Sequence, residues 1–258
     1  MKPTLMLAAA CALCAAGAQA QDNIESDRPD FVESSKVVGK GRFQFETGLL
    51  FERDRNEAGR ERVLSTPTLL RFGLGETIEL RIDTEGRMRR HSSEDGRRST
   101  EAGYGDTAVG LSWHLLDAGG GRPSVGVLAS AEFDSGSRAF RGEGVRPALR
   151  VVGEWELPNE MTLGVMPGIG VERDESGRYR YGLLGLIVEK EFGERVRGFA
   201  EVALPHIARS RHGGVEASFD VGAAYLLSKD VQLDAMFSRG LNSRTPDVAF
   251  TIGLSIRR

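Results

Sequence analysis

Cysteine is almost absent from this chain: two residues of 258, Cys11 and Cys14, both within the first twenty positions. Those positions have the form of a secretory signal, with Lys2, an apolar run, and a small-residue cleavage site before Gln21. We therefore expect residues 1–20 to be removed and the mature chain to have no thiol for a disulfide, a metal site or a nucleophile. The alternative, a lipoprotein anchored at Cys11, would need an unusually short apolar core of about seven residues.

Long apolar runs are also missing. Beyond residue 20 no stretch approaches the roughly 20 apolar residues that a membrane helix needs, and the mean hydropathy is −0.27. Insertion into a membrane would therefore require a closed β-barrel. A net charge of −3 is too close to neutral to indicate a nucleic-acid partner. No linker-like segment divides the mature chain, which we interpret as one domain.

The usual marks of catalysis are scarce. His91, His114, His206 and His212 are scattered without metal-ligand spacing, and there is no Gly-x-Ser-x-Gly motif. His114 and Ser112 share one strand face, where a lumen hydrogen bond explains them better than a catalytic pair. We expect no metal, no cofactor and no enzymatic activity, with an outer-membrane lipid-acting enzyme as an alternative.

Strict two-residue alternation is what the sequence does have, most clearly between Gly214 and Ile256. Successive side chains on a strand point to opposite faces, so these runs have one apolar face and one face of small or charged groups. The pattern is typical of a transmembrane β-barrel with lipid outside and a polar lumen. Glycine, at 33 residues, suits strands that tilt and pack closely in a barrel wall.

The alternating runs between residues 42 and 258 predict an antiparallel barrel of about twelve strands. The odd-numbered connections are longer and charged, for example 53–62 and 89–103, while the even-numbered ones are mostly tight turns. Bacterial barrels have short periplasmic turns and longer extracellular loops, and an even strand count returns both termini to the periplasm. The outward face of the strand over 179–192 is not fixed by its pattern.

The polar face of the alternating runs predicts the side chains that line the lumen. They are Glu46, Glu79, Arg81, Asp83, Glu85, Arg87, Glu132, Asp134, Arg150, Asp220 and Asp234. Two interpretations stay open: a charge-lined pore, or a lattice of ion pairs that blocks the lumen because buried charge needs a partner.

Residues 21–41 precede the first strand and have no period. Five of them form the centre of a possible plug: Asp27, Arg28, Pro29, Asp30 and Glu33. The segment could enter the lumen and pair with wall charges, and Pro29 favours an extended course. The alternative is a solvated periplasmic lead-in.

The predicted loops are rich in arginine, whose planar fork binds phosphate at two points. The residues are Arg53, Arg55, Arg60, Arg89, Arg90, Arg97, Arg98, Arg138, Arg141, Arg178, Arg209 and Arg211. They could contact lipopolysaccharide phosphates, or they could be ordinary solvated loop residues among interleaved acids.

Several short motifs in order resemble the outer-membrane transporter family labelled "MetA-pathway of phenol degradation". They are Asp27-Arg28-Pro29-Asp30-Phe31 with Glu33-Ser34, Gly39-Lys40-Gly41-Arg42, Gly105-Asp106-Thr107 with Gly110-Leu111, Trp155-Glu156-Leu157-Pro158, Gln232-Leu233-Asp234, Gly240-Leu241 and Gly253-Leu254-Ser255. The sequence departs from the family at Phe133-Asp134-Ser135-Gly136 and at its end, Arg257-Arg258, which replaces an aromatic residue. The resemblance covers nearly the whole mature chain and implies an outer-membrane location.

Together the patterns and the resemblance predict a passive outer-membrane channel or transporter for small molecules, with aromatic or hydrophobic compounds implied by the family alone. A closed barrel with a structural or interaction role is the main alternative. The expected partners are outer-membrane lipid, lipopolysaccharide, a small solute and the outer-membrane assembly machinery.

Overall fold

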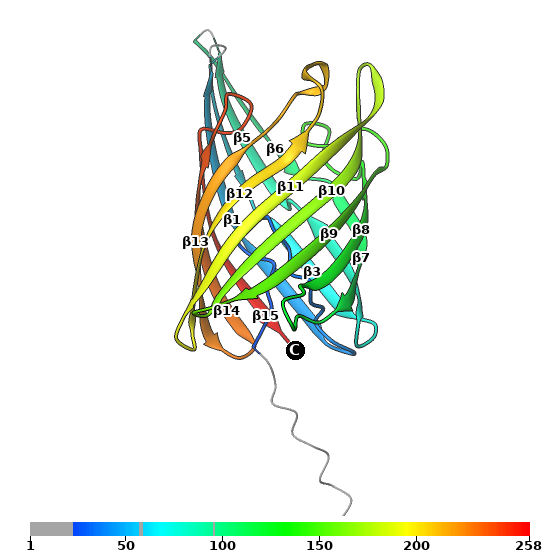
Figure 1. The fold of residues 1–258 in the computed structure, drawn as a ribbon. Helices are drawn as coiled ribbons and strands as arrows, with labels where there is room; N and C mark the ends of the chain where they lie inside the picture. Colours follow the sequence, from blue (N-terminus) through cyan, green and yellow to red (C-terminus); the bar gives the residue numbers. More distant parts are fainter. Residues whose placement is uncertain (1–22, 57–58, 95) are drawn as a thin grey trace, which may run out of the picture.

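The computed structural model describes residues 23–56, 59–94 and 96–258. They form one antiparallel sheet whose first and last strands pair, so that the sheet closes into a barrel (Figure 1). The secretory signal predicted for residues 1–20 lies outside the described residues. Within the described part no helix is long and apolar enough to cross a membrane.

Fifteen strand segments make up the wall. They are β1 (Phe43–Asn56), β2 (Gly59–Ser65), β3 (Thr68–Gly73), β4 (Ile78–Thr84), β5 (Arg87–Glu94), β6 (Arg97–Tyr104), β7 (Thr107–Leu116), β8 (Ser124–Phe133), β9 (Arg146–Leu157), β10 (Met161–Asp174), β11 (Gly177–Phe192), β12 (Val196–Ile207), β13 (Ser218–Ser228), β14 (Val231–Gly240) and β15 (Val248–Arg257). A short 3-10 helix, η1 (Ser210–His212), lies between β12 and β13.

Three pairs of segments are single barrel strands with a break in the middle. β1 pairs with both β2 and β3, β5 continues β4 alongside them, and β6 continues into β7. Counting each pair once leaves twelve barrel strands, which confirms the predicted all-β antiparallel barrel of about twelve strands.

The three breaks lie side by side across the wall. Pro67 interrupts β2 and β3 because it has no amide hydrogen to donate, and its carbonyl accepts from Gly48 N at 3.2 Å. Gly86 interrupts β4 and β5 with a φ of 65°, a conformation that favours glycine. Gly105 N donates to Gly86 O at 2.9 Å and extends the line of breaks to β6 and β7.

The break at Gly86 is also a β-bulge. Between the pairs Leu64↔Arg89 and Thr68↔Thr84, three residues intervene on one strand and four on the other. The extra residue reverses which side chains face the lumen. The inward series of β4 ends after Arg81 and Asp83, and Met88 rather than Arg87 is buried on β5.

Large apolar side chains cover the outside of the barrel. Leu111 and Trp113 on β7, Ile169 on β10, Phe219 on β13 and Phe250 on β15 are each 44–53% exposed. Water would not favour so continuous an exposed apolar surface, whereas lipid would, since outer-membrane barrels have an outward apolar band of about 25 Å.

The two ends of the barrel differ as expected for periplasmic and extracellular sides. The first described residue, Asn23, and the C-terminus lie at the end with the tight turns, such as Pro158–Glu160 and Lys229–Asp230 (Figure 1). We call this the periplasmic end. At the other end, the prediction of long loops over 53–62 and 89–103 was wrong. Strands β1, β2, β5 and β6 continue into these ranges and project beyond the rim. Their strongly polar composition on both faces hid the strand pattern.

We predict that a charge on the outer face is tolerated only near the membrane boundary. Leu111→Arg, in the middle of β7, should destabilise the barrel by about 2–4 kcal/mol, and the matched Leu74→Arg, in a periplasmic turn, by about 0–1 kcal/mol. Urea unfolding of protein refolded in lipid vesicles, followed by tryptophan fluorescence, measures both. Equal losses at the two positions would contradict the assignment of this face to lipid.

Candidate functional site in the barrel lumen

Residues 23–41, which we call the lumen segment, leave the periplasmic end and pass through the inside of the barrel before β1 begins (Figure 1). The segment has no regular secondary structure. Its Ile24, Val32 and Val38 are buried, as are Ser26 and Ser35. An irregular backbone can occupy such a position only where the wall supplies hydrogen-bond partners.

A cluster of buried charges holds the middle of the segment. Arg71, fully buried on β3, lies 2.8 Å from Glu79 and 3.3 Å from Glu46, both on the wall. Asp27 of the segment joins this cluster through Arg81, at 2.5 Å, and through Arg71, at 3.4 Å. Because each buried charge has an opposite partner, the cluster avoids most of the desolvation cost of isolated ions.

Arg28 anchors the segment to the seam where the barrel closes. Its guanidinium donates to Asp234 at 3.2 Å and to Thr251 at 2.9 Å. The side chain lies directly against Gly48 on β1 and Gly253 on β15, which are paired across the seam. Any side chain at either glycine would overlap the guanidinium, so this close approach requires glycine.

Wall carboxylates also hold the backbone of the segment. Both oxygens of Glu201 on β12 accept amide hydrogens, from Phe31 at 2.9 Å and from Val32 at 2.7 Å. Glu154 on β9 accepts from the amide of Ser35 at 3.0 Å. Glu79 accepts from Val38 N at 2.8 Å. Hydrogen bonds to charged acceptors contribute about 1.5–3 kcal/mol each, so these contacts specify one course for the segment.

One side of the lumen is apolar, which the alternation pattern did not predict. Six wall residues form a buried cluster that packs against Val32 of the segment, with Phe31 at its edge. The wall members are Leu128, Val152, Met166, Leu183, Ile187 and Phe199, from β8 to β12. The lumen therefore has a charged network on β1, β3 and β4, and β8 to β12 contribute an apolar cluster beside their own charged residues such as Arg150, Glu154 and Glu201.

Most of the predicted lumen residues do face the interior. Glu46, Glu79, Arg81, Asp220 and Asp234 are buried. Arg150 lies 2.8 Å from Glu33 of the segment, and Glu132 lies 3.1 Å from Arg146. Asp83 and Glu85 line an internal cavity.

Two of the predicted lumen residues lie elsewhere. Arg87 is exposed on the outer face, because the bulge at Gly86 reverses the alternation just before it. Asp134 follows the last residue of β8 and is exposed at the extracellular rim. Neither side chain lines the lumen.

The predicted plug residues all lie in the lumen segment. Asp27 and Arg28 make the contacts given above, and Arg28 is joined to Pro29 by a cis peptide bond. Asp30 lies 3.7 Å from Arg197 on β12. Glu33 lies between Arg150 and Arg81, the latter at 3.7 Å.

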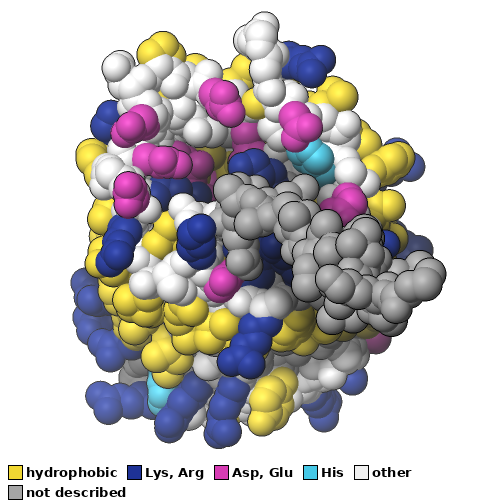
Figure 2. Space-filling view, turned by 90° about the horizontal axis from the view of Figure 1, so that it is seen from below, with side chains coloured by type: hydrophobic (Ala, Val, Ile, Leu, Met, Phe, Trp, Pro, Cys, Tyr) yellow, Lys and Arg dark blue, Asp and Glu magenta, His cyan; other side chains and the backbone are white. Residues whose placement is uncertain are grey.

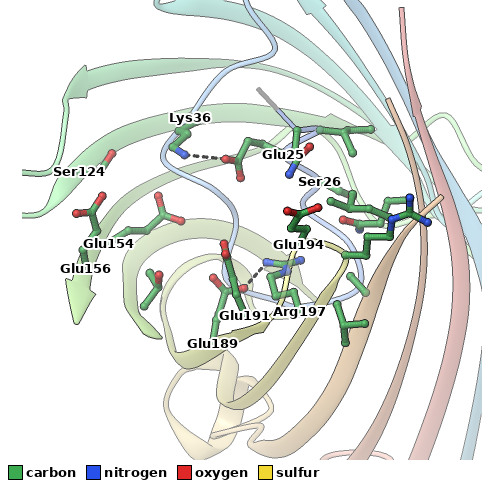
Figure 3. A pocket seen from close by; sticks show the side chains of 18 of the residues that line it. Glu25, Ser26, Lys36, Ser124, Glu154, Glu156, Glu189, Glu191, Glu194 and Arg197 are labelled. Carbon is green, nitrogen blue, oxygen red and sulfur yellow. Dashed lines mark hydrogen bonds and ion pairs between the residues drawn. The ribbon is translucent and has the colours of Figure 1, made fainter. Parts of the chain in front are cut away.

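Cavities lie on both sides of the segment and share no lining residue. The extracellular one has about 270 Å³ and includes Asp83 and Arg150. The periplasmic one has about 320 Å³ and opens among acidic side chains, visible as the magenta groups at the barrel mouth (Figure 2). Glu154, Glu156, Glu189 and Glu191 point into it from the wall (Figure 3). The segment thus separates the two ends of the lumen.

The histidines that looked scattered in sequence meet in part at the extracellular end. His212 stacks on Tyr179 with ring centres 4.2 Å apart, and the hydroxyl of Tyr179 lies 3.2 Å from Nε2 of His206. His212 Nδ1 lies 2.6 Å from Asp174, at the tip of β10. Hydrogen bonds from Ser176 and His212 lower the pKa of this Asp174 to about 2. The cluster ties the β12–β13 loop to the β10–β11 hairpin.

Ser112 and His114 do not form a pair. His114 contacts the carbonyl of Ser35 and the carboxylate of Asp117, each at 3.0 Å. Ser112 is fully buried. Over the part of the chain that the structure describes, no group of three or more His, Cys, Asp or Glu residues is placed to hold a metal ion.

Several residues that hold the segment were not in the predicted set, namely Arg71, Arg197, Glu201 and Ser35. Glu201 lies on a strand whose alternation is irregular in sequence, and Ser35 resembles any polar residue of a lead-in. Both residues have partners far away in the sequence. Glu201 is 169 and 170 positions from the two residues whose amide hydrogens it accepts, and Ser35 is 119 positions from Glu154. Only the strand register reveals such pairs.

Comparison with known families gives one match over most of the chain. The model of the family described as "Putative MetA-pathway of phenol degradation" matches residues 26–257. The match begins at Ser26, inside the lumen segment, so the family pattern includes the segment as well as the barrel. A comparison with curated proteins found no match.

Solved structures with a similar fold are outer-membrane barrels. The COG4313 outer membrane channel from Pseudomonas putida F1 has a TM-score of 0.60 at 12% identity, over 87% of this chain and 97% of that one. The β domain of the Bordetella autotransporter BrkA has a TM-score of 0.55 at 13% identity, over 84% and 99%. The KdgM porin in complex with disordered oligogalacturonate has a TM-score of 0.51 at 11% identity, over 83% and 98%. At these identities the likeness concerns the fold.

We predict that Glu201→Gln loosens the lumen segment. A glutamine amide presents one acceptor oxygen instead of two, so one of the two backbone hydrogen bonds is lost, at about 1.5–3 kcal/mol. Trypsin cleavage after Lys36 should become roughly tenfold faster or more. Glu191→Gln, on an exposed residue at the periplasmic end of β11 that has no ion pair with the segment among the described residues, is the matched control and should leave the rate unchanged. An unchanged rate for Glu201→Gln would show that this carboxylate does not hold the segment.

Proposed function

Since this chain belongs to the family described as "Putative MetA-pathway of phenol degradation", we propose that it is an outer-membrane channel for small molecules whose lumen segment acts as a removable plug. The observation that carries the proposal is the position of the segment, which crosses the lumen between two separate cavities. Its contacts with the wall are hydrogen bonds, ion pairs and the apolar packing of Phe31 and Val32, and no strand of the sheet includes it. The segment can therefore leave without opening the barrel.

The wall keeps most of its charge pairing when the segment leaves. Arg71 retains Glu46 and Glu79, and Arg81 retains Glu79 at 3.2 Å. The carboxylates that depart from this cluster are Asp27 and Glu33. An emptied lumen would then have a balanced charged side instead of bare buried ions, which is a condition for a water-filled passage.

The solute class follows from the two sides of the lumen. Departure of Phe31 and Val32 would uncover the apolar cluster on β8 to β12, which lies beside charged wall residues such as Arg150 and Glu201. A small molecule with an apolar or aromatic body and a polar end would contact both. The proposed transport is passive and uses no cofactor, since the segment and the wall supply all the groups involved.

A closed barrel with a structural or interaction role is the second candidate. Ion pairs between wall residues alone favour it, since Arg146 lies 2.5 Å from Asp106 and 3.1 Å from Glu132. Such pairs could block the lumen even without the segment. As partners we propose outer-membrane lipid with its lipopolysaccharide, the assembly machinery of that membrane, and the transported solute.

We predict that removal of residues 22–41 increases conductance. The refolded mature protein in a planar bilayer should show small or rare current steps, and the shortened protein should show larger and stable ones, because the segment fills the lumen. Silence from both forms would reject the open channel in favour of the closed barrel.

We predict that Gly253→Ala partly opens the channel. The added methyl group would overlap the guanidinium of Arg28 and weaken its contacts with Asp234 and Thr251, so open events should become several-fold more frequent. Gly75→Ala is the matched control because its methyl group would meet open space. Both are compared in the same bilayer recordings. If Gly253→Ala conducts like the control, Arg28 does not hold the plug.

A further inference from the structure

The extracellular extensions of four neighbouring strands separate their charges by face. On β1, β2, β5 and β6 the acidic side chains alternate with the arginines, and the acids point inward. Arg90, which also points inward, lies 3.5 Å from Glu61 and 3.4 Å from Glu101. The side chains on the outer face are Arg53, Arg55, Arg60, Arg62, Arg87, Arg89, His91 and Arg98. We call these eight residues the arginine face.

The strand register brings the arginines directly opposite one another. Arg53 pairs with Arg62, and Arg55 pairs with Arg60. Arg62 in turn lies opposite His91, while Arg60 and Arg98 both lie opposite Ser93. Like charges at directly opposite positions, with Cβ atoms about 4.5–5.5 Å apart, destabilise a sheet. An arrangement of this kind calls for an anion between the charged groups.

No acidic side chain of this protein supplies that anion in the described part of the chain. None of the arginines on the arginine face takes part in an ion pair between described residues. Arg60, Arg62, His91 and Arg98 instead surround an open hollow of about 470 Å³ with Ser93 and Thr100. Guanidinium forks and hydroxyl groups around one hollow suit phosphate oxygens.

The arginine face lies next to the apolar outer surface, and this position favours the phosphate of a lipid headgroup over other anions. Phe51 lies two residues before Arg53 and Leu64 two residues after Arg62 on the same outer face, and these two apolar residues are paired and exposed. The arginine face therefore continues the apolar outer surface directly upward, at the level of lipid headgroups on the extracellular side. The β1–β2 and β5–β6 hairpins rise together there (Figure 1).

We propose that the arginine face binds the phosphate groups of a phosphorylated glycolipid of the outer leaflet, of the lipid A type. The acyl chains lie along the apolar surface at Phe51 and Leu64, and the phosphates lie between the opposed arginines. The bulge at Gly86 is part of this site, because it turns Arg87 and Arg89 outward. This site would be where the proposed channel contacts lipopolysaccharide. The inference rests on the outer-membrane location in the proposed function, and it does not require that the barrel conducts.

The test compares binding of bisphosphorylated lipid A to full-length mature protein in detergent. The variant Arg53→Gln, Arg55→Gln, Arg60→Gln, Arg62→Gln should bind at least tenfold more weakly than wild type. The control Arg138→Gln, Arg141→Gln, Arg209→Gln, Arg211→Gln removes the same charge from other extracellular loops and should bind within twofold of wild type. Heat-dependent mobility in gel electrophoresis verifies that each variant is folded.

Further measurements separate the lipid from a simple anion. Lipid A without phosphates should bind wild type at least tenfold more weakly, and inorganic phosphate at millimolar concentration should displace little lipid. Lysine at the same four positions should give an intermediate loss, because lysine keeps the charge without the fork. Unchanged lipid binding in the folded glutamine variant, or full displacement by inorganic phosphate, overturns the proposal. Bilayer conductance of this variant should equal that of wild type, so failure here is distinct from failure of the channel.

Discussion

Pairing of charge inside a narrow lumen is the constraint on which the rest of the structure depends. Strand alternation points each wall side chain either to lipid or to the interior, and an interior charge that is buried away from water needs an opposite partner. Arg71 shows the outcome: it is fully buried and contacts Glu79, Glu46 and Asp27. Two of these partners come from the wall and the third from the lumen segment, so the segment completes a network that the wall has already begun.

The same alternation explains why a single bulge has consequences at both faces. Before Gly86 the charged residues of β4 point inward and contribute to the lumen network. After it Arg87 and Arg89 of β5 point outward and join the arginine face. One additional residue therefore divides a nearly continuous run of charged side chains between two tasks, pairing within the lumen and exposure at the membrane surface. A strand without the bulge would place Arg87 and Arg89 inside, among residues that already have partners.

The fold could be predicted from sequence because its signal is local. Alternation over ten residues is visible in one strand, and its repetition at β13, β14 and β15 gave the barrel and the approximate strand number. The direction of Glu46, Glu79, Arg81 and Asp234 followed from the same period. The extracellular extensions were missed because both of their faces are polar, which removes the apolar contrast that marks a strand. The bulge was missed because one glycine among 33 has no distinctive sequence context.

The site was less accessible to sequence reasoning because it depends on register. Glu201 and Phe31 are separated by 170 positions, and nothing near either residue indicates the other. The apolar side of the lumen was missed for a related reason. Val152 and Met166 stand at inward positions, where the alternation pattern predicts a polar face, but they pack against Phe31 and Val32, so their chemistry matches the segment instead of a water-filled lumen. Sequence alternation describes the wall alone and contains no information about what fills it.

The distribution of contacts indicates where the free energy that retains the segment is concentrated. The Arg71 cluster also contacts Asp27, Glu33 and the amide of Val38, but its own charges keep partners on the wall with or without the segment. Glu201 is different, because its two hydrogen bonds in the described structure are both to segment amides. Arg28 likewise gives Asp234 its positive partner. Departure of the segment therefore leaves Glu201 and Asp234 to be solvated by water entering the lumen. That exchange is favourable only if the lumen fills with water, which links release of the segment to hydration of the passage.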